Sequence, residues 1–257
     1  MRYNRSSQDT APPAGGFFLP QTHMADTTVT AGAARAPMNV FARFIGIIFS
    51  PKDTFQNVAA HPRVLGILIL ICAVSAVLLG GFFATQVGQD AWLEVATRGR
   101  EIPPEQMAMM EKMSRFAGPL AVGQAIVGVP IMLVIVAGIL FAIFNAVMGG
   151  NATFKQVFAI VTHSWVVPVV SQLFTLPLSY MRGTISSATN LGVLLPMIDE
   201  SSFLGHFLGS IDFFWIWTCI VLSIGLAVLY RRKTQSILVG FLSLYGVIAL
   251  IIALVKS

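Results

Sequence analysis

The chain has 257 residues and a mean hydropathy of +0.79; hydrophobic residues make up 56% of it and charged residues only 11%. A soluble domain carries about 25% charged residues, so this composition excludes an ordinary water-soluble protein and predicts a multi-spanning membrane protein. The net charge is +5. No basic run is long enough to follow a phosphate backbone, so we expect no nucleic-acid partner and interpret the cations as topology signals.

Residues 1–38 are rich in Ala, Gly, Pro, Thr and Ser and show no periodic apolar pattern. A segment of this kind cannot bury enough apolar surface to order its backbone, so we predict a disordered N-terminal tail. Met24 opens the sequence MADTTVTAGAARAP, which resembles a start of translation, and we hypothesise that residues 1–23 are dispensable. Residues 39–257 are predicted to form one membrane domain.

Five later stretches are long and apolar enough to cross a hydrocarbon core about 30 Å thick, which takes about 20 helical residues. They are residues 64–87, 119–148, 157–180, 211–230 and 236–254. The fold class predicted is an all-α integral membrane protein with five transmembrane helices. We expect a kink in the second span at Gly128-Val129-Pro130, and Pro168 and Pro177 should bend or break the third.

The distribution of Lys and Arg predicts the orientation of the chain. With the N-terminus in the cytoplasm, the inner segments hold ten Lys and Arg residues and the outer segments hold six. The triplet Arg231-Arg232-Lys233 then lies inside, and Asp199-Glu200 lies outside. Five spans put the C-terminus outside, so we predict a protein of the cell (cytoplasmic) membrane with a cytoplasmic N-terminus.

A short apolar segment precedes the first span. Its apolar residues recur at i, i+3, i+4, i+7 and i+8, which is one face of a helix. These residues are Phe41, Phe44, Ile45, Ile48 and Phe49. The segment is too short to span a bilayer, so we expect an amphipathic helix that lies in the membrane interface.

A second short helix is predicted to begin at Pro51, whose missing N–H is not needed in a first turn, with Ser50 as its N-cap. Phe55 and Val58 continue the apolar stripe, and Arg43 in the preceding helix is expected to point toward the lipid headgroups. The two helices together are predicted to anchor the chain at the membrane surface. The predicted anchoring residues are Phe41, Phe44, Ile48, Phe49 and Phe55.

Three segments resemble the Yip1 domain as it occurs in bacterial proteins. They are IIFSPKDTFQNVAAHPRVL before the first span, NATFKQVFAIVTHSWVVP into the third and LGSIDFFWIWTCIVLSIGL into the fourth. The resemblance covers about residues 39–255 and implies a helical membrane protein with five spans and a cytoplasmic N-terminus. Eukaryotic relatives act in vesicle trafficking and associate with prenylated Rab-type GTPases. The chain lacks a DLYGP-like motif in its N-terminal region, which argues against GTPase binding here.

Two polar residues are candidates for an intramembrane site. Asp212 could be an ion or proton ligand, because a carboxylate inside a membrane is costly and often functional. Alternatively it caps the helix that begins the fourth span, which the helix-end preference favours. His163 in the third span could titrate or bind a metal, but a buried, hydrogen-bonded packing role is favoured because no HxxxH, HxxE or CxxC pattern accompanies it.

The sequence shows no nucleophile elbow, Walker A loop, zinc-protease motif or dinucleotide fingerprint, so we expect no enzyme, no cofactor and no metal site. Cys72 and Cys219 lie in apolar runs and are expected to be small core residues. We predict a membrane scaffold or accessory protein whose partners are the lipid bilayer and either another membrane protein or a second copy. The alternative is a transporter or channel subunit that uses His163 and Asp212.

Overall fold

The computed structural model describes residues 37–98, 101–195, 197–199 and 202–256. The elements described below all belong to one compact unit, Ala36–Ser257. The predicted disordered tail over residues 1–38 lies outside the described residues except for its last two positions. The dispensable segment proposed for residues 1–23 lies wholly outside them.

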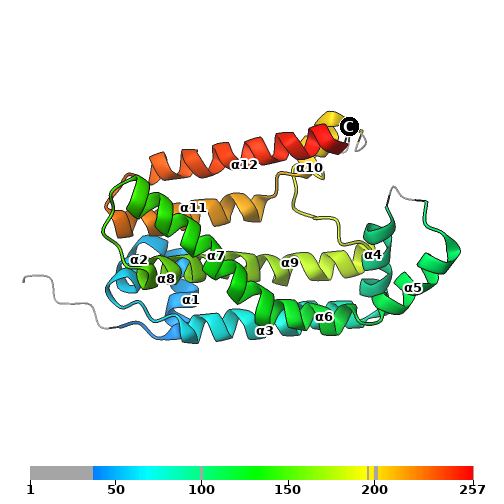
Figure 1. Ribbon diagram of the computed structural model, residues 1–257, viewed down its shortest axis with the longest axis horizontal. Coiled ribbons are helices and arrows are strands. Elements are labelled where there is room, and N and C mark those ends of the chain that lie inside the picture. Colours follow the sequence, from blue (N-terminus) through cyan, green and yellow to red (C-terminus); the bar gives the residue numbers. More distant parts are fainter. Residues whose placement is uncertain (1–36, 99–100, 196, 200–201, 257) are drawn as a thin grey trace, which may run out of the picture. The chain divides into compact units, whose positions relative to one another are not determined.

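Five helical segments are long and apolar enough to cross a membrane, and they confirm the predicted fold class. Within the described residues the regular elements are all helical, and the β-pairing is limited to an isolated bridge between Asn190 and Asp212. The first, fourth and fifth spans are single helices (Figure 1). They are α3 (Leu65–Ala84), α11 (Phe213–Tyr230) and α12 (Thr234–Lys256).

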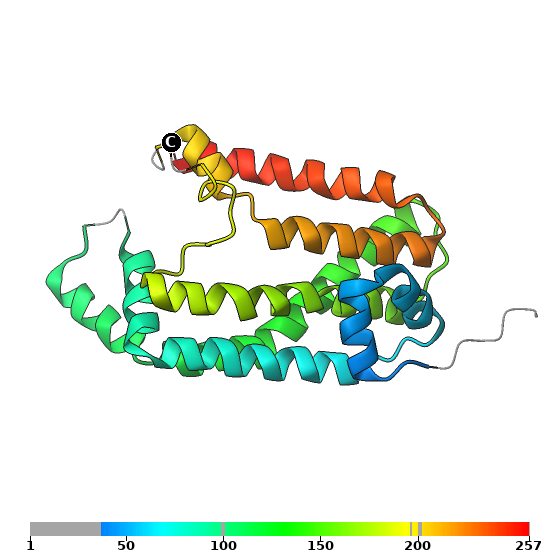
Figure 2. The ribbon, with the colours of Figure 1, turned by 180° about the vertical axis from the view of Figure 1, so that it is seen from behind.

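The second span is built from α6 (Ala117–Gly123) and α7 (Val129–Phe141), with a π-helical turn before α7 and another after it, η1 (Gln124–Gly128) and η2 (Ala142–Val147). The first π-turn ends just before Pro130, whose ring lacks the N–H that a regular helix would use there. In both ribbon views α6 runs alongside α3, and α7 then turns away across the bundle (Figures 1 and 2). The first π-helical turn therefore lies at the kink predicted for Gly128-Val129-Pro130.

The third span is broken at Trp165 into α8 (Phe154–Ser164) and α9 (Val166–Arg182). Pro168 has no N–H for the carbonyl of Ser164, so the helix cannot continue in regular register there. Pro177 lies inside α9 and does not end it. This span is the most enclosed of the five, since most of its residues are buried while most residues of the others are not. It runs through the middle of the bundle, between α3 and α11 (Figures 1 and 2).

Two short helices precede the first span, α1 (Val40–Phe49) and α2 (Pro51–Ala60), and α2 starts at Pro51 as predicted. α2 packs against α8 and α11, and its Phe55 is fully buried. A Cβ added at Gly225 of α11 would lie 3.0 Å from the Phe55 ring and 2.6 Å from Ile160 of α8. The assignment of Phe55 to the surface anchor is therefore wrong: the glycine opens a space in the bundle, and the ring fills it instead of facing lipid.

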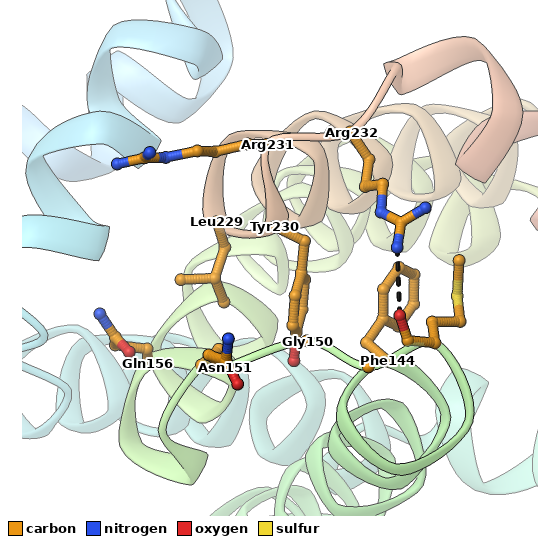
Figure 3. A pocket seen from close by; sticks show the side chains of 11 residues that line it. Phe144, Gly150, Asn151, Gln156, Leu229, Tyr230, Arg231 and Arg232 are labelled. Atoms are coloured by element: carbon orange, nitrogen blue, oxygen red, sulfur yellow. Dashed lines mark hydrogen bonds between the residues drawn. The ribbon is translucent and has the colours of Figure 1, made fainter.

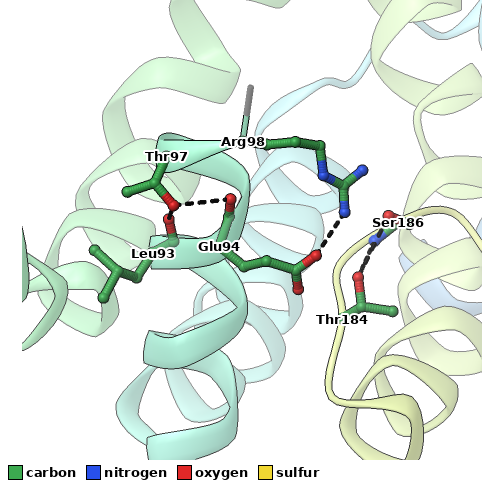
Figure 4. Close-up of polar contacts among 6 residues, drawn as sticks. All are labelled: Leu93, Glu94, Thr97, Arg98, Thr184 and Ser186. Atoms are coloured by element: carbon green, nitrogen blue, oxygen red, sulfur yellow. Dashed lines mark hydrogen bonds and ion pairs between the residues drawn. The ribbon is translucent and has the colours of Figure 1, made fainter. Parts of the chain in front are cut away.

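The remaining helices lie in the connections, namely α4 (Gln86–Thr97), α5 (Pro104–Ser114) and α10 (Phe203–Gly209). The end of α4 is closed by local polar contacts, which Figure 4 shows beside the turn containing Thr184 and Ser186. Thr97 Oγ1 donates to the carbonyl of Leu93 (2.9 Å), and Arg98 pairs with Glu94 at 2.6 Å. Both charged side chains are about half exposed. An exposed i, i+4 pair of this kind contributes only about 0.3–0.5 kcal/mol, so it adds little to the stability of the helix end.

Candidate functional site

Asp212 is the N-cap of α11. One carboxylate oxygen accepts hydrogen bonds from the backbone N–H groups of Phe214 (2.8 Å) and Trp215 (3.3 Å). The other accepts from the hydroxyls of Ser187 and Thr189, the latter at 2.6 Å. Both oxygens are thus engaged in closing the helix end and in fixing the loop before it, as the capping interpretation of the sequence anticipated.

The backbone around Asp212 is also tied to the fifth span. The Tyr245 hydroxyl of α12 accepts a hydrogen bond from the N–H of Asp212 and donates one to the carbonyl of Ser210, each at 2.9 Å. These two backbone groups have no helical partner at the start of α11, because a helix leaves its first N–H groups and the chain before it unpaired. Tyr245 therefore joins the last two spans at this end.

His163 is fully buried in α8. Its Nδ1 lies 2.7 Å from the carbonyl oxygen of Ala159. A carbonyl can only accept, so Nδ1 carries a proton and the ring is fixed against its own helix. The Nε2 atom has no hydrogen-bond partner in the described part of the chain. His163 and Asp212 line different cavities with no residue in common, so the structure does not bring the two candidates together.

Arg43 is buried, with only 2% of its surface exposed, although we expected it to face lipid headgroups. Its Nη2 donates to Asn57 Oδ1 and to the carbonyl of His61, both at 3.0 Å, and its Nη1 donates to the carbonyl of Arg63 (3.3 Å). The expectation was wrong because the carbonyls beyond the end of α2 need a donor, and the guanidinium supplies one by turning inward. Burial, and then the charge of Arg63, lowers the pKa of Arg43, which still stays charged.

A cavity of about 570 Å³ is lined by residues of α1, of the start of α3 and of α8. Arg43 and His163, both buried, contribute to its lining, and Arg63 and Lys155 are exposed at its edge. Apolar residues from the start of the first span complete the wall, and Leu65 is 74% exposed. Of the described residues that line this cavity, none is acidic. We call it the α1–α3 cavity.

A second cavity, of about 430 Å³, lies between the turn after η2 and the end of α11 (Figure 3). The rings of Phe144 and Tyr230 stack there with centroids 4.8 Å apart, and the Tyr230 hydroxyl donates to Asn145 Oδ1 (2.8 Å). Arg232 donates to the carbonyl of Met148 at 3.1 Å, whereas Arg231 points away from it. These contacts join the second and fourth spans at this end. Arg231 does not share the hydrogen bond to Met148 that Arg232 makes.

Four of the five predicted anchor residues lie on α1. Phe41 and Phe49 are 70% and 80% exposed, and Ile45 between them is also exposed. Phe44 and Ile48 are half-buried and pack against the core. α1 therefore presents an outward apolar edge of Phe41, Ile45 and Phe49, while its opposite side is held by the bundle.

Sequence reasoning missed the polar residues that hold α1 and line the α1–α3 cavity, namely Arg43, Asn57, Arg63 and Lys155. One signal was available: Arg43 is the only charged residue of a ten-residue apolar helix. A cation in such a helix needs oxygen partners if it faces the protein, and Asn57 together with the free carbonyls after α2 supplies them. Within the described residues no group of three or more His, Cys, Asp or Glu side chains could hold a metal ion.

The five apolar spans, preceded by the two short helices α1 and α2, define an integral multi-pass membrane protein of the α-helical class. The sequence profile of the Yip1 domain matches residues 45–256, so the chain belongs to the Yip1 family. It is also 26% identical over 187 residues to "Membrane protein YknW" of Bacillus subtilis (strain 168), an alignment that covers 70% of this chain and 75% of that protein. No solved structure matches the chain significantly.

Proposed function

We propose that this Yip1-family protein is a non-catalytic membrane scaffold or accessory protein, which organises the membrane or recruits a partner protein or a second copy of itself. It acts from the cell (cytoplasmic) membrane, with its N-terminus in the cytoplasm and its C-terminus outside. A role in vesicle trafficking is implied only by the resemblance to eukaryotic relatives, and it is not part of the proposal.

The observation that carries this proposal is the outward apolar edge of α1. Phe41, Ile45 and Phe49 are exposed on a helix that Arg43 fixes to the rest of the domain from its other side. A rigid helix with an exposed apolar edge is suited to lie at a lipid surface or against another apolar helix. Fixing the edge in advance lowers the entropy lost when a partner binds.

The orientation is supported by the Lys and Arg residues near the ends of the spans. Several cations fall in segments that the five spans place on the same side. They are Lys52 on α2, Arg63 before α3, Lys155 on α8 and the Arg231–Lys233 turn. Cations of this kind are retained in the cytoplasm during insertion. The side that carries α1 and α2 is therefore the cytoplasmic one in this proposal.

The transporter alternative is not favoured. Asp212 is used as a helix cap, and several buried hydroxyls are bonded to their own helices. Thr162 and Ser164 donate to carbonyls four residues earlier at 2.7 and 2.9 Å, and Ser223 does so at 2.6 Å. An ion path needs polar groups that face one another or a water-filled space, whereas the hydroxyls of Thr162, Ser164 and Ser223 are turned to their own helices.

The proposal is tested by replacing Phe41, Ile45 and Phe49 together with Asn. The matched control replaces the same three residues with Leu, which keeps the edge apolar. Tagged proteins are extracted into native nanodiscs, and the co-purified proteins are compared with those of the wild type. We expect the Asn variant to fold but to lose its partner or its self-association, and the Leu variant to keep it. An unchanged set of partners in the Asn variant would refute the role of this edge.

The orientation has its own test. Cysteines are introduced at exposed positions on the two sides, Lys52→Cys on α2 and Gln106→Cys on α5. A thiol reagent that cannot cross membranes should label Gln106→Cys in intact cells, and should label Lys52→Cys only after the membrane is opened. The reverse pattern would overturn the orientation.

A further inference from the structure

Two side chains that line the α1–α3 cavity each carry a buried nitrogen atom without a hydrogen-bond partner in the described part of the chain. They are Nε of Arg43 and Nε2 of His163, on side chains that are 2% and 0% exposed. Both residues line the cavity, and neither atom is hydrogen-bonded within the described residues. Native proteins rarely leave buried polar atoms unsatisfied, because the lost contact with water is not recovered. An acceptor oxygen of a ligand would satisfy the Nε–H of Arg43, whereas Nε2 of His163 carries no proton while Nδ1 does and would accept a hydrogen bond instead.

The charges around the cavity specify the kind of ligand. Arg43 from the buried side, and Arg63 and Lys155 from the exposed edge, are cations, and the described lining includes no carboxylate. Three like charges that converge without a counter-charge repel one another, and the burial of Arg43 increases that cost. An anion with several acceptor oxygens removes the repulsion and takes the free guanidinium N–H.

The position of the cavity specifies where the anion comes from. Its wall includes Val64, Leu65 and Ile67, which begin the first span, and Leu65 is exposed on the outside of the bundle. A Cβ at Gly66 would lie 2.6 Å from Val40, so α1 approaches α3 closely here and closes one side of the cavity. The start of a span lies at the level of the lipid headgroups, so the cations face headgroups and the exposed apolar residues face acyl chains.

We propose that the α1–α3 cavity binds a phosphate group, and that an anionic phospholipid of the surrounding leaflet supplies it. Arg43 donates its free Nε–H to a phosphate oxygen from the buried side, and Arg63 and Lys155 neutralise its charge from the edge. The acyl chains lie along the exposed side of Leu65. The volume of about 570 Å³ is within the usual range for a site of this size.

The test uses the purified full-length chain in mild detergent, titrated with dioleoyl phosphatidylglycerol and, in parallel, dioleoyl phosphatidylcholine. Bound lipid is counted by native mass spectrometry. We expect tighter binding of the anionic lipid, and about tenfold weaker binding in the double variant Arg63→Gln/Lys155→Gln, whose side chains are exposed at the edge of the cavity.

The control variant Lys52→Gln/Lys233→Gln removes two exposed cations from the same side of the protein that do not line this cavity. It should bind the lipid within about twofold of the wild type, as surface charges act weakly at a distance. Equal weakening in the control and in the edge variant would overturn the site, as would unchanged binding in the edge variant.

A further titration with inorganic phosphate distinguishes the two sources of the anion. Lipid that resists displacement by phosphate supports the headgroup as the ligand. Phosphate that binds by itself, displaces the lipid and loses affinity in the edge variant supports the phosphate site and assigns it to a free ion. The α1 edge tested above does not line this cavity, so failure of either proposal leaves the other standing.

Discussion

Replacing Arg43 by Gln should release α1 from the end of α2 while leaving every spanning helix intact. The guanidinium holds one amide oxygen and two backbone carbonyls, at 3.0, 3.0 and 3.3 Å, and the shorter neutral Gln cannot reach all three. Asn57 keeps a second donor, the N–H of Met38 at 3.2 Å, but the carbonyls of His61 and Arg63 lose their side-chain donor.

A buried acceptor left without its donor costs about 1–3 kcal/mol. Two such carbonyls, both only partly buried, give a loss of about 2–4 kcal/mol in the free energy of unfolding. The relief of a desolvated charge offsets part of this loss, so the lower half of the range is the better expectation. The free energy of unfolding of Arg43→Lys should lie between those of Arg43→Gln and the wild type. The Lys ammonium keeps the charge but lacks the planar set of N–H donors with which a guanidinium reaches several acceptors at once.

The free energy of unfolding is measured by denaturant titration in detergent, and limited proteolysis reports whether α1 has come loose. Lys52→Gln serves as the control, since Lys52 is exposed on the same pair of helices and should change stability by less than about 0.5 kcal/mol. An Arg43→Gln protein as stable as this control, and equally resistant to protease between α1 and α2, would refute the account of Arg43 as the residue that fixes α1.

Three further substitutions test the packing and the helix ends. Gly225→Ala would place a Cβ 2.6 Å from Ile160 and 3.0 Å from Phe55, so it should lower stability by about 1–3 kcal/mol, measured by the same titration; a neutral result would contradict the tight packing of α2. Asp212→Ala removes the cap of α11 and should cost about 1–2 kcal/mol while leaving the fold helical by circular dichroism. Thr153→Ala breaks the capping box at the start of α8 and should cost about 1 kcal/mol; a loss below about 0.3 kcal/mol would argue against the box.

The spans could be predicted because their signal is carried by length and composition alone. A run of about 20 apolar residues has few other uses, and the observed helices begin and end within a few residues of the predicted limits. The break near Pro168 and the cap at Asp212 followed from local chemistry, a missing N–H and a carboxylate at a helix start.

The burial of Phe55 and Arg43 could not be predicted in this way. Inside a membrane protein, an apolar side chain that packs on another helix and one that faces lipid give the same periodic pattern, because lipid is as apolar as a protein core. What distinguishes Phe55 is Gly225, 170 positions later in the chain, which opens the space for its ring. The burial of Arg43 likewise depends on backbone carbonyls that become free only where α2 ends. The burial of both side chains is therefore decided by tertiary contacts and not by the local sequence pattern.

These long-range contacts change the physical role of the N-terminal helices. A surface anchor that only lay on the bilayer would adjust its depth and angle freely, and its phenylalanines would act as loose hydrophobic contacts. Here α2 is locked by Phe55 and α1 by Arg43, and only a few residues separate α2 from the start of α3. The position of Phe41 and Phe49 relative to the first span is thus fixed. If the α1–α3 cavity binds a lipid headgroup as we propose, the same fixation lets one rigid element present both the apolar edge and the cationic cavity to the membrane surface.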